Sequence, residues 1–289
     1  MTSPPRLSIR LPSRPPIRLA LALAAAAAIA APAAAHASPR PLPFTYQNET
    51  LPSEALEAEQ YIDLIPVRVV RELADGTTEG VVSVRSLLQT ELEYGITDRL
   101  EVALYFAFRQ GGSSGTPFMR FEGLKQRLRY RFADPGELPL DVGVYLEVAE
   151  FHNEIELEEK ILLGRRFGAL NVLANLWVEQ EWYFQTRDTK YIYNPTIGAT
   201  YEVSPRLSFG AEYWVRGRFD DRSADEVMAE TTDVPTGTVH YAGPTLLLQA
   251  KKAWISVGAY ARLDHLGDSL ATGDPYGKLW FRTLVGIDL

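Results

Sequence analysis

Residues 100–108 read LEVALYFAF, and residues 140–148 read LDVGVYLEV. In both stretches apolar side chains occupy every second position, while charged, small or tyrosine side chains stand between most of them. A period of two is that of a β-strand with one apolar face and one polar face. The same alternation recurs along most of the chain after residue 54. The sequence therefore predicts a protein built of many similar strands.

The first 37 residues have the pattern of an export signal. Four arginines between residues 6 and 18 precede an unbroken apolar run, Leu19–Ala31, and the small residues of a cleavage site follow at Ala35–Ala37. The apolar run is shorter than the ~20 residues that a membrane-spanning helix needs. A cleaved signal peptide is therefore favoured over an uncleaved anchor, and we predict cleavage between Ala37 and Ser38.

The composition excludes several classes of function. The chain has no Cys, so neither a disulfide framework nor a lipid-modified cysteine is available. Four of the 29 Lys and Arg residues, and none of the 37 acidic residues, precede Ser38, which leaves 25 basic residues against 37 acidic ones in the exported part. Such an acidic chain offers no basic face for phosphates, so we expect no nucleic-acid partner.

The alternation predicts twelve strands whose connections alternate in length. Short turns rich in Gly, Pro and Asp alternate with longer polar loops, which is typical of an outer-membrane β-barrel with its short turns in the periplasm. The expected strands are approximately residues 55–68, 81–96, 99–109, 118–132, 139–150, 153–166, 168–184, 191–203, 206–218, 238–250, 253–263 and 277–289. The expected turns are residues 95–98, 133–136, 204–205 and 251–252, and the expected loops are residues 72–80, 110–117, 185–190, 219–237 and 264–275.

We therefore predict an all-β fold, a transmembrane antiparallel up-and-down β-barrel of about 12 strands in the bacterial outer membrane. Residues 54–289 would form the barrel, and residues 38–53 a short periplasmic segment. The strand that ends at Leu289 resembles the C-terminal signal read by the barrel-assembly machinery. That machinery and the outer-membrane lipid are the expected partners. Aromatic belts are expected at the two membrane interfaces, with Tyr94, Tyr130, Phe132 and Tyr201 at the turn end and Phe106, Phe108, Trp182 and Phe184 at the loop end.

A soluble periplasmic β-sandwich or lipocalin-like barrel would also alternate. It would bury its apolar face inside and would need only eight or so strands. Twelve strands with faces of Leu, Val, Ile and Phe present more apolar surface than one closed core can hold. The membrane barrel is therefore favoured, and the orientation of the two faces tests it.

The polar face of the strands is rich in charge, and function would reside there. The candidate lumen residues are Lys125, Arg127, Arg129, Arg131, Glu154, Glu156, Glu158, Glu179, Glu181, Arg216, Arg218, Arg262 and Arg282. Opposed acidic and basic walls could select small solutes along an aqueous path. Alternatively, the same residues could pair across strands and fill the lumen with a network of ion pairs. A gated or ligand-binding lumen is a third interpretation.

Catalysis is not predicted. A covalent mechanism needs a nucleophile beside a base, and after Ser38 the chain offers only His152, His240 and His265, which we interpret as solvated loop residues or isolated histidines. Without Cys, and with dispersed His, no metal cluster is expected. Asp264, Asp268 and Asp274 could hold calcium, but an ordinary polar loop is favoured. No cofactor is predicted.

Two stretches carry a resemblance to a known family. Residues 94–105, YGITDRLEVALY, form a tight turn between two apolar strands, and residues 46–52, YQNETLP, are followed by EAEQ at residues 57–60. These stretches resemble bacterial outer-membrane barrels labelled as transporters, including the phenol-degradation-pathway type. The resemblance implies a location and an architecture. It brings no agreed substrate and no catalytic residues.

The prediction that follows is a narrow, porin-like channel or transporter for small polar or charged solutes. The alternative is a non-conducting structural or surface-interaction barrel that acts through residues 219–237 and 264–275 and has a salt-bridged lumen. An outer-membrane hydrolase comes third.

Overall fold

The regular elements of the protein are β-strands throughout the part that the structure describes. The computed structural model describes residues 38–111, 118–220, 237–264, 266 and 274–289. Within these ranges, no helix is long and apolar enough to cross a membrane. The strands are β1 (Leu56–Glu72), β2 (Thr78–Thr97), β3 (Leu100–Gly111), β4 (Phe118–Arg131), β5 (Asp141–Phe151), β6 (Glu154–Phe167), β7 (Leu170–Tyr183), β8 (Thr189–Tyr193), β9 (Thr196–Ser204), β10 (Leu207–Arg218), β11 (Val239–Gln249), β12 (Ala253–Arg262) and β13 (Leu279–Asp288).

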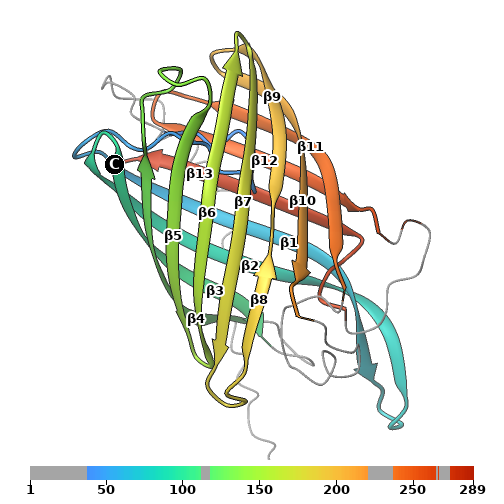
Figure 1. Cartoon of the computed structure of the whole chain (residues 1–289). Coiled ribbons are helices and arrows are strands. Elements are labelled where there is room, and N and C mark those ends of the chain that lie inside the picture. The colour runs from blue at the N-terminus through green and yellow to red at the C-terminus, as the bar shows by residue number, and fades with distance from the viewer. Residues whose placement is uncertain (1–37, 112–117, 221–236, 265, 267–273) are drawn as a thin grey trace, which may run out of the picture. The chain divides into compact units, whose positions relative to one another are not determined.

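The strands close into an antiparallel barrel (Figure 1). Apart from β8 and β9, which do not pair with each other, each strand pairs with its neighbours in the sequence. Strand β1 also pairs with β13, from Glu57 opposite Asp288 to Leu64 opposite Phe281. Because β8 and β9 both pair with β7 and with β10, they share one place in the wall. The barrel therefore has twelve strand positions, which confirms the predicted fold class.

The strand predicted at residues 191–203 is broken at Asn194 and Pro195. Proline has no N–H to donate to a neighbouring strand. The wall nevertheless stays joined at the break, because the Asn194 N–H donates to the Trp177 carbonyl at 2.9 Å and the Val215 N–H donates to the Pro195 carbonyl at 3.1 Å. The break is thus local and does not open the barrel.

Among the connections whose residues are all described, two differ in length from the prediction by four residues or more. Residues 72–80 were expected as a loop, but β1 and β2 continue until only residues 73–77 join them, and this long hairpin projects beyond its neighbours (Figure 1). Its turn is closed by Asp75, which accepts hydrogen bonds from the Thr77 hydroxyl at 2.6 Å and the Thr77 N–H at 3.0 Å. These bonds hold the pKa of the Asp75 carboxyl below its usual value. The turn after β4 is longer than expected, residues 132–140.

The barrel buries polar side chains and exposes apolar ones. In β5, Asp141, Tyr145 and Glu147 are buried on the inner face, whereas Leu146 between them is 42% exposed on the outer face. The same inversion holds for Leu128 of β4, for Leu176 and Val178 of β7, and for Ile197 and Val203 of β9, which are 39–57% exposed. A soluble barrel would have the opposite arrangement. The orientation of the faces therefore excludes the soluble alternative and fits a barrel surrounded by lipid.

The aromatic residues expected in two belts lie on or beside the outer face. Tyr94, Phe132, Phe184 and Tyr201 are each more than 40% exposed, and Tyr130, Phe106, Phe108 and Trp182 are half-buried. Tyr130 contacts Phe132 edge-on with ring centroids 5.4 Å apart, and Phe108 contacts Phe121 at 5.6 Å. Rings of this kind at the strand ends suit the two membrane–water interfaces.

Residues 38–53, here called the inner segment, lie inside the barrel. The sequence predicted a short periplasmic segment here and gave it no position relative to the barrel. Nearly every residue from Ser38 to Leu51 is buried, including Leu42, Thr45 and Leu51 at 0–1% exposure. The physical reason is the inward-facing polar wall, because the carboxylates and amides of the strands need partners and the segment supplies backbone N–H groups.

Candidate channel lumen

The inner segment is bound to three separate parts of the barrel wall. The Phe44 N–H donates to Glu212 of β10 at 3.0 Å, and the Thr45 N–H donates to the same carboxylate. Asn175 of β7 accepts from the Tyr46 N–H at 2.7 Å and donates to the Tyr46 carbonyl at 2.9 Å. On β3, Glu101 accepts from the Leu51 N–H at 2.7 Å. The segment therefore crosses the lumen from wall to wall.

Aromatic packing holds the middle of the inner segment. The Phe44 ring lies 4.6 Å from Trp214, 5.2 Å from Tyr260 and 5.9 Å from Trp280, measured between ring centroids. Trp214 in turn stacks on Tyr241 at 4.3 Å. Each such pair contributes ~0.5–1.5 kcal/mol beyond the burial of its area. Phe44 is thus the anchor of the segment on the β10–β13 side.

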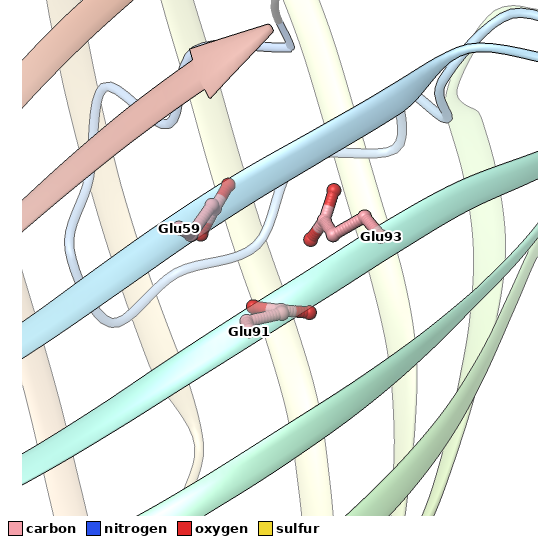
Figure 2. A group of neighbouring side chains, drawn as sticks. All are labelled: Glu59, Glu91 and Glu93. Carbon is pink, nitrogen blue, oxygen red and sulfur yellow. The ribbon is translucent and has the colours of Figure 1, made fainter. Parts of the chain in front are cut away.

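A buried ionic network lies on the opposite side of the lumen. Arg127 of β4 lies 2.8 Å from both Glu91 and Glu93 of β2, and it also pairs with Glu101. Arg129 pairs with Glu101 at 2.8 Å. These side chains are 2% exposed or less. Figure 2 shows Glu91 and Glu93 beside Glu59 of β1.

The inner segment takes part in this network through Arg40. Its guanidinium lies 3.6 Å from Glu59, and it donates a hydrogen bond to the Tyr61 hydroxyl. The same guanidinium lies 3.7 Å from the centre of the Tyr46 ring, and the Lys160 ammonium lies 4.3 Å from that centre. Cation–ring contacts of this kind are strongest where water is excluded.

A cavity of about 1030 Å³ opens on the loop side of the inner segment. Phe44 and Tyr46 form part of its floor. Acidic side chains from β6 and β7 line one part of the wall, and basic side chains from β2, β3, β4 and β13 line another. The acidic residues are Glu154, Glu156, Glu158, Glu179 and Glu181, and the basic ones include Arg85, Arg109, Arg120 and Arg282.

A second cavity, of about 330 Å³, lies on the turn side. Its lining includes Gln47, Asn48 and Glu49 of the inner segment, together with Pro135 and Gly168 from the short connections. Consecutive parts of one segment therefore line the two cavities. The inner segment is the partition between them.

The basic residues predicted on β4 lie in three different places. Lys125 reaches the loop-side cavity and pairs with Glu147 at 2.9 Å. Arg127 and Arg129 lie in the buried network. Arg131 is at the turn end, where it donates to the Asp98 carbonyl at 2.8 Å and pairs with Asp134 at 3.1 Å.

The other predicted arginines each have an acidic partner. Arg216 pairs with Glu179 at 2.8 Å and Glu181 at 3.2 Å, and Arg282 pairs with Asp63 at 2.6 Å. The other two arginines lie where the strands join the loops and do not line the cavity. Arg218 pairs with Asp220, and Arg262 pairs with Asp264 and Asp274. Arg262 thus meets two of the three acids considered for calcium.

The histidines and several loop predictions can be placed only in part. His152 lies at the rim of the loop-side cavity. His240 is on the outer face, where its Nδ1 is 2.7 Å from the Tyr213 hydroxyl. His265, Asp268, most of the loops at 219–237 and 264–275, and the predicted signal peptide at 1–37 lie outside the described residues.

Two groups of three carboxylates converge in the lumen, Glu59–Glu91–Glu93 and Glu156–Glu179–Glu181. Oxygen ligands of this kind suit calcium or magnesium. Arginine meets both groups, however, through Arg40 and Arg127 in the first and Arg216 in the second. The arrangement is that of an ion-pair network.

Sequence reasoning missed Phe44 and Tyr46 of the inner segment, Asn175, which binds Tyr46, and Asp63, which binds Arg282. One signal was present. Leu42, Phe44 and Tyr46 alternate with Pro41, Pro43 and Thr45, and three large apolar residues are unusual in a segment that faces water on all sides.

The fold and the lumen together define a closed twelve-position barrel with an apolar exterior and a charged interior. No protein-family model and no curated protein matches the chain. Among solved structures, it is similar to an outer membrane channel from Pseudomonas putida F1, at 12% identity over 84% of this chain and 98% of that one, with a TM-score of 0.59. It is also similar to the NanC porin, at 10% identity over 81% of this chain and 99% of that one, with a TM-score of 0.50. The likeness shows that the chain has the fold of outer-membrane channel barrels.

Proposed function

We propose that this protein is an outer-membrane channel for small polar or charged solutes, and that the inner segment closes it. The observation that carries the proposal is the partition: Phe44 and Tyr46 line the loop-side cavity, and Gln47–Glu49 line the turn-side cavity. Moving this one segment would join the two cavities into a path through the barrel. The barrel fold and the apolar exterior support a location in the outer membrane.

The contacts of the segment suit a closure that can open. Most are backbone hydrogen bonds to Glu212, Asn175 and Glu101, aromatic contacts of Phe44, and the Arg40–Glu59 pair. Each hydrogen bond and each ring contact is worth ~0.5–3 kcal/mol, and breaking the buried Arg40–Glu59 pair costs about 3–5 kcal/mol. The wall on both sides is rigidified by its own strand pairing, so the segment can leave without breaking the barrel.

The charges of the loop-side cavity would select the solute. Acidic side chains of β6 and β7 face basic ones of β2–β4 and β13, of which Arg109 and Arg120 pair with Glu122, and Arg282 with Asp63. The excess of acids along β6 and β7 produces a field across the path rather than along it. Such a field favours small polar or zwitterionic solutes and retards large apolar ones. The proposal therefore includes the class of solute that the channel would pass.

A disulfide across the partition tests the closure. The chain has no cysteine, and Asn48 Cγ lies 3.3 Å from the position that a Cβ on Gly143 would occupy, so the pair Asn48→Cys and Gly143→Cys is within bonding geometry. We expect the oxidised protein to give no current steps in a planar bilayer. After reduction, steps should appear as in the wild type, and each single variant should be insensitive to reductant.

The second candidate is a non-conducting barrel, and the buried network of Arg127 and Arg129 favours it. A chain that begins at Pro52, and so lacks most of the inner segment, separates the two. The channel proposal expects larger and more frequent current steps from this chain than from the full mature chain. A folded, heat-modifiable barrel that gives no current at any voltage would contradict it and support the non-conducting barrel.

A further inference from the structure

Glu57, like Glu212 of β10, is a buried carboxylate of the lumen that forms no ion pair with a lysine or arginine among the described residues. It lies at the start of β1, points inward and is 0% exposed. Its neighbours Glu59, Glu91, Glu93 and Glu101 all have an arginine partner. No lysine or arginine within the described ranges forms an ion pair with Glu57. Its partners are two N–H donors, the Trp254 indole at 2.5 Å and the Ser38 backbone nitrogen at 3.0 Å.

The Ser38 nitrogen is also the atom that signal-peptide removal would change. In the uncleaved chain it is an amide with no charge. Cleavage between Ala37 and Ser38, the site predicted from the Ala35–Ala37 pattern, converts the same atom into an ammonium group. Hydrolysis adds water across the peptide bond, so Ala37 leaves with the carboxylate and Ser38 keeps the new amine.

We propose that the α-ammonium of Ser38 is the counter-charge of Glu57, and that this ion pair completes the binding of the inner segment inside the barrel. A buried carboxylate without a cation is costly, and a charged donor at 3.0 Å roughly doubles the strength of the hydrogen bond. The proposal rests on the cleavage site and on the closing role proposed for the inner segment. It adds that the inner segment closes the barrel after the signal peptide has been removed.

The surroundings of Ser38 favour an ordered terminus. Ser38 is buried, and the Gln47 side-chain amide, from the returning arm of the segment, donates to the Pro39 carbonyl at 3.1 Å. On the wall side, the Trp254 indole and Gly286 pack against the Glu57 carboxylate. In this setting the Ser38 nitrogen donates to the Glu57 carboxylate at 3.0 Å.

A two-by-two comparison of refolded chains tests the pair. One chain begins at Ser38 and the other carries one additional glycine before it, which moves the ammonium away from Glu57. Each is made with Glu57 and with Glu57→Gln. All four carry Thr45→Cys, a fully buried position in the inner segment, and the rate of its modification by a maleimide reports exposure of the segment.

With Glu57 present, we expect the added glycine to speed labelling about tenfold or more, the size of a lost charged hydrogen bond. In the Glu57→Gln pair the glycine should change the rate less than twofold, because no ion pair is left to lose. Equal effects in both backgrounds would overturn the proposal.

Two further measurements keep the outcome decisive. If the chains with the additional glycine do not refold, Glu57→Gln on the chain that begins at Ser38 must alone speed labelling, and an unchanged rate overturns the ion pair. Mass spectrometry of the protein isolated from outer membranes must show a terminus at Ser38, and another terminus overturns it too. Labelling measures no current, so a barrel that fails to conduct leaves this test unaffected.

Discussion

Arg127 carries its charge at a point that water does not reach. Its guanidinium is fully buried and contacts Glu91 and Glu93 at 2.8 Å, together with Glu101. A buried ion pair contributes little net stability compared with apolar residues of the same shape, but removing one partner is severe because the other charge is left alone. The buried glutamates of β2 and β3 therefore depend on Arg127 and its neighbour Arg129 for their counter-charge.

We expect Arg127→Ala to lower the free energy of unfolding by about 3–5 kcal/mol. The matched control is Arg71→Ala, which removes an arginine whose side chain is 61% exposed and which pairs with Glu79 at 3.6 Å. An exposed pair is worth less than about 1 kcal/mol. Urea unfolding of both variants in lipid vesicles measures the difference, and similar losses would show that the buried network is not what holds this side of the lumen.

At the scale of elements, β6 and β7 place a wall of carboxylates along the loop-side cavity. Glu156 is paired with Glu181 in the register, and Glu158 with Glu179, so acids stand opposite acids on adjacent strands. Like charges directly opposite each other are destabilising in a sheet. Arg216 of β10 and Lys125 of β4 lie on either side of this wall and offset part of that cost.

Because Glu156 faces the cavity and belongs to no ion pair among the described residues, it is the acid best placed to act on a passing ion. In the chain that begins at Pro52, Glu156→Gln should shift the reversal potential under a salt gradient toward anion selectivity. Glu159→Gln is the control on the same strand, since Glu159 is exposed on the outer face. Identical shifts in reversal potential for the two variants would rule out an ion path through the barrel along β6 and β7.

At the scale of the whole molecule, the barrel is arranged inside out relative to a soluble protein. Charged side chains such as Glu91 and Arg127 are inside and apolar ones such as Leu176 are outside, and the pairing of β1 with β13 leaves no free edge on the sheet. Closure matters in lipid, because an unpaired strand edge there would leave backbone groups without partners.

We expect Leu176→Arg, at a 55% exposed outer-face position of β7, to cost about 2–4 kcal/mol in vesicles. Val82→Arg is the control. Val82 is 76% exposed but lies on the projecting β1–β2 hairpin, where a charge near the interface should cost less than about 1 kcal/mol. Equal costs, or no cost for Leu176→Arg, would contradict the placement of the lipid-facing band.

Strand positions could be predicted because the signal is local. Alternation reports which face a side chain occupies, and Gly, Pro and Asp report where the chain turns, so most predicted strand ends lie within about two residues of the observed ones. Prediction failed where local signals conflict. Asn194–Pro195 breaks one strand, and β1 and β2 continue into residues that were interpreted as a loop.

The sequence by itself determined the barrel, its strand count and the division between a polar face and an apolar face, since these follow from a period of two and from turn chemistry. Only the tertiary structure decided what fills the lumen. Phe44 meets Glu212 across 168 positions of sequence, and Trp254 meets Glu57 across 197. Contacts of that range depend on the curvature that brings distant strands together, and no local pattern records it.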